Sequence, residues 1–128
     1  MVAVSGFYYI ATPYRAYPGG MEAAFKRAAK VTAQMIDAGV EVYSPIVHSH
    51  PTSKFVRLAP PEGDFWLERQ IPFLQAAAGL IIVCMPGWLD SGGIKFERRF
   101  NADAGKPEWL LPEPVRLPLP SGIERGPL

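Results

Sequence analysis

The sequence has almost no cysteine, since Cys84 is the one thiol among 128 residues. A single cysteine excludes a disulfide within the chain and any metal cluster held by several thiolates. Cys84 lies inside the apolar run from Leu80 to Met85. We therefore expect it to pack as a small hydrophobic side chain in the core rather than to act as a reactive group.

An excess of charge of either sign is also absent, because 13 Lys and Arg against 12 Asp and Glu leave a formal net charge of +1. The chain thus offers no long-range attraction to a nucleic-acid polymer or an anionic membrane. No apolar stretch reaches the ~18 residues that a spanning helix needs, and the N-terminal residues lack the basic start of a secretory signal. We expect a cytoplasmic protein without a membrane partner.

Proline, by contrast, is abundant, and six of the 14 prolines fall between Pro107 and Pro127. Because proline cannot continue a helix, residues 112–128 are predicted to form an extended arm. Residues 1–111 have the length of one domain. With 48% hydrophobic and 20% charged residues, the chain has the composition of a globular protein.

Strand-like and helix-like patterns alternate along the chain. The continuous apolar run over residues 80–85 is typical of a strand buried on both faces of a parallel sheet. Residues 45–63 are rich in proline and are predicted to form a long loop. The other patterns predict strands at 7–11, 40–44 and 108–111, and helices at 20–38, 64–77 and 91–104. This alternation predicts an α/β fold with a doubly wound sheet of four to five mostly parallel strands and helices on both faces.

The segment that follows the buried strand carries the first candidate for chemistry, Glu97. Ligands of open α/β sheets bind beyond the carboxyl ends of the strands, where helix N-termini present free N–H groups. Taken alone, Glu97 is also compatible with a solvated carboxylate near a helix start. The start of this helix has few side chain atoms, because it consists of Ser91, Gly92 and Gly93. A helix needs no double glycine for its stability, so the two glycines point to another role. We therefore favour a functional role for Glu97.

A second carboxylate is needed if the chemistry is retaining glycosyl transfer. Such a reaction uses a nucleophilic carboxylate at the anomeric carbon and a group that protonates the leaving atom, roughly 5 Å apart. Asp90, Asp64 and Glu68 are the acids that could reach Glu97. Asp90 has an alternative role as the cap of the following helix.

Histidine and tyrosine side chains supply further candidates. His48 and His50 form a His-x-His pair, but no third metal ligand stands out nearby, so we favour substrate positioning or pairing within the loop over a metal site. Tyr9 and Tyr14 lie at the end of the first predicted strand and face either the ligand crevice or the core.

Four pieces of the sequence resemble a known group when they are taken together and in order. The chain is similar to the nucleoside 2-deoxyribosyltransferase-like proteins, and within that group to small bacterial and phage proteins of the DUF1937 type. The resemblance covers the chain from about Phe7 to Pro107. The matching pieces are residues 9–14, 43–51, 66–74 and 86–97.

The resemblance implies a flavodoxin-like sheet that binds a nucleoside or nucleotide at the strand ends. It implies that Glu97 attacks C1′ of a 2-deoxyribosyl group and displaces the base, while Ser91 and Gly93 hold the 5′ oxygen or phosphate. It also implies a homo-oligomer in which the arm from Pro112 onward serves a neighbouring site. We expect no cofactor and no metal ion. The expected substrate-binding residues are Tyr9, Thr12, Tyr14, His48, His50, Gln70, Gly87, Trp88, Ser91, Gly92 and Gly93.

One departure from the family pattern concerns the acid. The family usually has an aspartate in the second helix and another that opens the central strand, and these positions hold Gln70 and Ala78 here. An amide can form hydrogen bonds but cannot donate a proton as a general acid does. Three interpretations stay open: an N-glycosidic hydrolase or transferase that is slow or uses Asp64, Glu68 or Asp90 as its acid, a nucleotide-binding or regulatory module without turnover, and a flavodoxin-like interaction protein.

Overall fold

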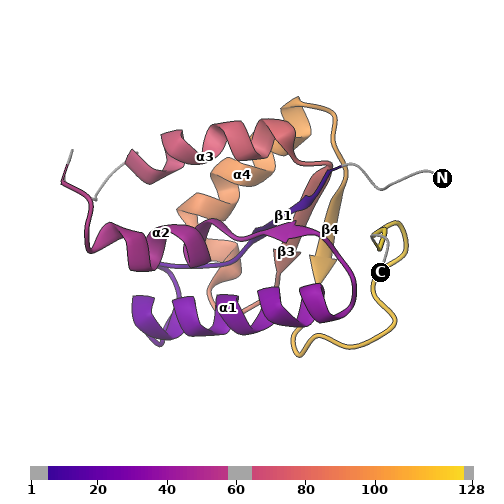
Figure 1. Cartoon of the computed structure of the whole chain (residues 1–128), viewed down its shortest axis with the longest axis horizontal. Coiled ribbons are helices and arrows are strands. Elements are labelled where there is room, and N and C mark those ends of the chain that lie inside the picture. The colour runs from indigo at the N-terminus through magenta and orange to yellow at the C-terminus, as the bar shows by residue number, and fades with distance from the viewer. Residues whose placement is uncertain (1–5, 58–64, 126–128) are drawn as a thin grey trace.

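The computed structural model describes residues 6–57 and 65–125 and contains a four-stranded parallel sheet (Figure 1). The strand order is β2-β1-β3-β4, and every neighbouring pair is parallel. The prediction of a doubly wound α/β sheet is therefore confirmed, with four strands, in an arrangement consistent with a flavodoxin-like fold. The strands are β1 (Tyr8–Ala11), β2 (Val42–Tyr43), β3 (Gly79–Val83) and β4 (Glu108–Leu111).

Helices cover both faces of this sheet. In Figure 1, α1 (Met21–Asp37) lies on one side, and α3 (Phe65–Ala76) and α4 (Gly92–Asp103) lie on the other. Strands β1 and β3 are buried along their whole length, because alternate side chains enter a core on each face. None of the helices in the described ranges has both the length and the apolar character that crossing a bilayer requires.

The proline-rich arm packs on the α1 face of its own chain. Val115, Leu119 and Ile123 lie against the core that α1 forms with the sheet. The backbone N–H of Glu124 donates to the Tyr8 hydroxyl at 2.8 Å. In residues 112–125 the arm therefore covers apolar surface of the domain that precedes it.

The prediction of a loop over residues 45–63 is wrong in its first half. Residues Pro45–Ser53 form a helix, α2, and residues 58–63 lie outside the described ranges. Ser44 caps the helix by accepting a hydrogen bond from Val47 N at 3.3 Å. Pro45 occupies the first helical position, where its missing N–H would have no partner in any case.

Candidate functional site

A small cavity of about 160 Å³ opens at the carboxyl edge of the sheet. Its walls come from the segments that follow β1, β2 and β3, together with the first half of α3. The chain leaves β1 and β3 toward opposite faces of the sheet, so the cavity lies at the switch point where ligands of such sheets bind. Its lining residues are Thr12, Tyr14, Arg15, Ala16, Ile46, Ser49, Trp66, Leu67, Gln70, Ser91, Gly92, Gly93 and Glu97.

Glu97 brings a buried carboxyl group to this cavity. It lies in the second turn of α4, and only 4% of its surface is exposed. Burial raises the pKa of Glu97 to about 8, and a smaller effect of the Tyr9 hydroxyl acts in the opposite direction. The alternative of a solvated carboxylate at the helix start is therefore wrong.

Tyr9 and Gln70 form a buried polar pair beside Glu97. The Tyr9 hydroxyl donates to Gln70 Oε1 at 3.1 Å, and both side chains are almost fully buried. The pKa of Tyr9 is raised, first by burial and then by the charge of Glu97. Tyr9 is therefore neutral over the whole physiological range, and Gln70 supplies a neutral acceptor for its proton.

The N-terminus of α4 presents backbone without side chains. Ser91 caps the helix by accepting a hydrogen bond from Ile94 N at 3.2 Å. Among the residues that the structure describes, a Cβ atom at Gly92 would meet nothing within 4 Å, and one at Gly93 would meet only Ser91 Oγ at 3.8 Å. Neither glycine has a positive φ. Since neither backbone conformation nor packing requires glycine here, the two positions leave open space over the free N–H groups of the helix.

Thr12 adds a polar atom that the folded chain leaves unsatisfied. It follows β1 directly, lines the cavity and is 4% exposed. Within residues 6–57 and 65–125, its Oγ1 has no hydrogen-bond partner. Buried polar atoms nearly always have a partner, so an unpaired hydroxyl in a cavity wall points to a ligand atom.

Tyr14 connects the cavity to α1 through a histidine. Its hydroxyl lies 2.7 Å from His50 Nδ1, and His50 Nε2 lies 2.5 Å from Glu22 Oε2. Phe25 stacks on the imidazole with ring centroids 4.6 Å apart. His50 therefore forms its hydrogen bonds within the protein. Its backbone belongs to α2, while Phe25 and Glu22 of α1 contact its ring and its Nε2 atom.

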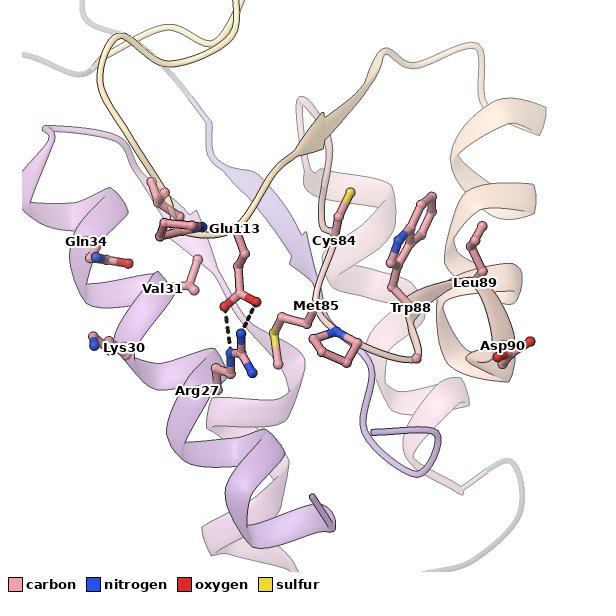
Figure 2. Close-up of a pocket in the computed structure, with 14 residues that line it drawn as sticks. Arg27, Lys30, Val31, Gln34, Cys84, Met85, Trp88, Leu89, Asp90 and Glu113 are labelled. Carbon is pink, nitrogen blue, oxygen red and sulfur yellow. Dashed lines mark hydrogen bonds and ion pairs between the residues drawn. The ribbon is translucent and has the colours of Figure 1, made fainter. Parts of the chain in front are cut away.

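A second, larger cleft of about 840 Å³ contains three of the expected site residues, Gly87, Trp88 and Asp90 (Figure 2). Figure 2 shows Trp88 across this cleft from Arg27 on α1. Arg27 already binds Glu113 through Nε and Nη2, so its charge is paired. Among its described lining residues, the cleft has neither the unpartnered buried hydroxyl nor the buried carboxyl that mark the smaller cavity.

The structure does not bring Asp90 to Glu97. Asp90 ends a short 3-10 helix, Trp88–Asp90, is exposed, and lines the larger cleft. Its alternative role as the cap of α4 is also wrong, because Ser91 holds that position. Cys84 is only partly buried and borders the same cleft, in contrast to the expected core thiol.

Gly87 has a structural task rather than a visible contact with the cavity. Its φ is 89°, and a Cβ atom there would lie 2.2 Å from the carbonyl oxygen of Ala16. Glycine therefore allows the segment after β3 to approach the segment after β1. The latter segment, residues 14–16, forms one wall of the cavity.

Of the remaining acid and histidine candidates, His48 and Glu68 lie outside the cavity lining. His48 is exposed and rests near the rings of Tyr43 and Phe73, with centroids 6.1 and 6.3 Å away. Glu68 is exposed on α3, outside the cavity lining. Asp64 lies outside the described residues. In the part of the chain that is described, Glu97 is the only carboxyl group in the cavity wall.

Several lining residues were not expected from the sequence. Ile46 and Ser49 come from α2, which the prolines concealed, although their spacing of three residues fits one face of a helix. Trp66 and Leu67 lie in the predicted helix, but no pattern marks them as ligand contacts. Arg15 and Ala16 follow Tyr14 directly.

Across residues 6–57 and 65–125, no group of three or more His, Cys, Asp or Glu side chains is arranged to hold a metal ion. Comparison of the sequence with curated proteins gives no significant match. The model of a family described as "Domain of unknown function (DUF1937)" matches residues 6–112. This match includes all four strands and every lining residue of the cavity, and the chain belongs to the DUF1937 family.

Proposed function

We propose that the protein cleaves or transfers the N-glycosidic bond of a 2-deoxyribonucleoside or deoxynucleoside monophosphate, with Glu97 as the nucleophile. The observation that carries the proposal is a buried carboxyl in a cavity that also holds an unpartnered hydroxyl and a bare helix N-terminus. The sequence resemblance to the nucleoside 2-deoxyribosyltransferase-like proteins, on the segments that build these walls, gives the substrate class.

Different walls of the cavity suit different parts of a nucleoside or nucleotide. The N–H groups at Gly92 and Gly93 suit a 5′ hydroxyl or phosphate. Trp66 and Leu67 offer an aromatic and an apolar surface for a base. The sugar then lies between them, with C1′ at Glu97. The cavity suits a free nucleoside or nucleotide rather than a nucleic-acid polymer.

Attack by Glu97 requires its ionised form. Because the pKa of Glu97 is raised to about 8, roughly one molecule in ten is ionised at pH 7 in the protein alone. Burial disfavours the negative charge, so formation of the neutral glycosyl ester relieves that unfavourable charge. Water as the acceptor gives a hydrolase, and a second base gives a transferase.

The proposal is tested by incubating the protein with deoxynucleosides and their 5′ monophosphates and following the release of free base by chromatography. Intact-mass spectrometry of the quenched reaction checks for a 2-deoxyribosyl ester. We expect base release by the wild type and loss of both signals in Glu97→Gln. Glu41→Gln, an exposed site just before β2, is the matched control and keeps full activity. No base release from any substrate, or full activity in Glu97→Gln, would refute the proposal.

A nucleotide-binding module is the second candidate, and one observation favours it. The resemblance to the nucleoside 2-deoxyribosyltransferase-like proteins implies an aspartate at position 70, whereas the residue there in the cavity wall is Gln70, an amide. Titration calorimetry separates the two candidates. Binding of a nucleotide with no base release supports the module, whereas base release supports the enzyme.

A further inference from the structure

The cavity is connected to solvent by three side chains that can pass protons. Tyr14 lines the cavity, His50 lies behind it on α2, and Glu22 lies in the first turn of α1. The Tyr14 hydroxyl lies 2.7 Å from His50 Nδ1, and His50 Nε2 lies 2.5 Å from the Glu22 carboxylate. The side chain of His50 is 11% exposed and that of Glu22 is 57% exposed. One end of this series of side chains therefore lies in the cavity wall, and the other meets water.

The chemistry of the acceptor fixes where the protons lie. A carboxylate can only accept, and the hydrogen bond with His50 lowers the pKa of Glu22, so Nε2 carries a proton toward Glu22. In neutral His50 the other nitrogen, Nδ1, then accepts the proton of Tyr14. In the imidazolium form Nδ1 donates to the tyrosine oxygen, and the tyrosine proton is free to point into the cavity.

The orientation of the imidazole is held from two sides. Phe25 stacks on one face, with an angle of 21° between the ring planes, while Tyr14 meets the ring edge-on at 79°. Three cations of the described residues also face the relay. Arg15 faces Tyr14, while Lys26 on α1 and Lys54 after α2 face Glu22. These contacts leave His50 little freedom other than the exchange of a proton.

We propose that Tyr14 is the general acid and base of the Glu97 cavity, and that His50 and Glu22 supply and withdraw its proton. This inference rests on the proposed function. Gln70 cannot act as a general acid, and the proposal gives that role to Tyr14, which lies on the segment after β1. Tyr14 touches the substrate and is the catalytic residue, whereas His50 and Glu22 act through it as positioning residues.

The protons balance over two steps. In the first, the Glu97 carboxylate bonds to C1′ as the bond from C1′ to the base breaks. The base nitrogen takes the Tyr14 proton, and Tyr14 takes the Nδ1 proton of the imidazolium. In the second step, water bonds to C1′ and the ester to Glu97 breaks. The water proton passes to Tyr14, and the Tyr14 proton returns to His50. An acceptor base with an N–H group replaces water in a transferase.

The test compares two substrates that differ in their need for an acid. 2′-Deoxyguanosine, or its 5′ monophosphate, needs a proton on the departing base. The N7-methylated form already carries a positive charge below neutral pH and leaves as a neutral base without protonation. We expect Tyr14→Phe to lower kcat/KM by about 100-fold or more on the first substrate and by no more than about threefold on the second.

The positioning residues are tested by the same ratio. His50→Gln keeps a hydrogen-bonding side chain that cannot carry the proton, and it is expected to show the same selective loss. Glu22→Gln is expected to show a smaller selective loss that shrinks as salt is raised, because this carboxylate is largely exposed. Tyr17→Phe is the matched control, since its hydroxyl binds Arg27 outside the cavity, and it leaves both rates unchanged.

The outcomes separate this inference from the proposed function. If Tyr14→Phe loses the same factor on both substrates while its thermal midpoint stays near that of the wild type, Tyr14 only binds or orients the sugar, and the relay is wrong. Unchanged activity in Tyr14→Phe overturns the relay as well. If no substrate releases base, or if Glu97→Gln stays active, the proposed function itself has failed.

Discussion

The Tyr9 hydroxyl donates its only proton to Gln70 Oε1, and Tyr9 also lies close enough to Glu97 for that carboxyl to raise its pKa. The amide at position 70 is thus the neutral partner in a group of three buried polar side chains. A carboxylate in the same place would add a like charge beside Glu97, which disfavours ionisation of both.

Replacing this amide by an acid is expected to make stability depend more strongly on pH. Gln70→Glu keeps the shape of the side chain, but at alkaline pH it places two buried carboxylates together. We expect a loss of about 2 to 4 kcal/mol at pH 8 and a much smaller loss at pH 5, measured by urea unfolding. Gln75→Glu, an exposed position on α3, is the control. Equal losses at the two pH values would contradict the proximity of Gln70 and Glu97.

Glu97 itself is expected to destabilise the fold as pH rises. Its pKa is raised from 4.5 to about 8 on folding, so the folded chain holds the proton more tightly than the unfolded chain. Wild-type stability therefore falls between these two pH values. Each pKa unit is worth about 1.4 kcal/mol, so Glu97→Gln should exceed the wild type by a few kcal/mol more at pH 9 than at pH 4. A difference that does not change with pH would show that Glu97 is not buried as described.

The same pKa predicts a pH dependence of catalysis. With the N7-methylated substrate no acid is needed, so kcat/KM follows the ionised fraction of Glu97 in the free protein. It should rise about tenfold per pH unit between about pH 5 and pH 7, where the carboxyl is mostly protonated. Initial rates of base release, corrected for the reaction without protein, measure this. A flat profile would exclude Glu97 as the nucleophile.

Thr12→Val is expected to change stability and affinity in opposite directions. The substitution removes a buried hydroxyl that has no partner in the described chain, so it should be neutral or stabilise the fold by about 1 kcal/mol. If the hydroxyl contacts the ligand, nucleotide affinity should fall by about tenfold. Thermal unfolding and calorimetry measure the two effects. Thr52→Val, at an exposed position on α2, serves as the control for affinity, and an unchanged affinity in Thr12→Val would remove Thr12 from the site.

Gly87→Ala is expected to disturb the cavity wall after β1. The new Cβ would collide with the Ala16 carbonyl, and a φ of 89° is itself unfavourable for alanine. We expect a loss of about 2 to 4 kcal/mol. Gly105→Ala is the matched control, since its φ is 70° but nothing lies within 4 Å, and it should cost only about 1 kcal/mol. Similar losses in the two variants would show that the close approach at Ala16 is relaxed at little cost.

The sequence predicted the fold well because the periodic signals are local. Each signal depends only on residues near one another in the sequence. Examples are the apolar run of β3, the amphipathic pattern of α1, and Gly39, which follows α1 with a φ of 83°. Helix α2 was missed because composition conflicts with it. Its prolines favour a loop on average, yet Pro45 stands where proline is tolerated and Ser44 caps the helix.

The cavity was predictable only where the topology fixes it. Glu97 and the glycines before it follow a central strand, so the carboxyl-edge rule places them correctly. The contact of His50 with Glu22 joins two helices across 28 residues, and no local sequence pattern in either segment predicts it. Asp90 ends a short 3-10 helix and lines the larger cleft rather than the cavity of Glu97, which the spacing of the two acids in the sequence does not reveal.

The packed core of the protein includes contacts from residues that follow the last strand. Every strand in the described residues ends by Leu111, and the family match ends at residue 112, yet Leu119 and Ile123 still pack against the core beside α1. The strands, the cavity lining and the relay all lie within residues 8–111, whereas the arm covers part of the opposite face. The stretch of sequence that contains the site is therefore shorter than the stretch that covers the core.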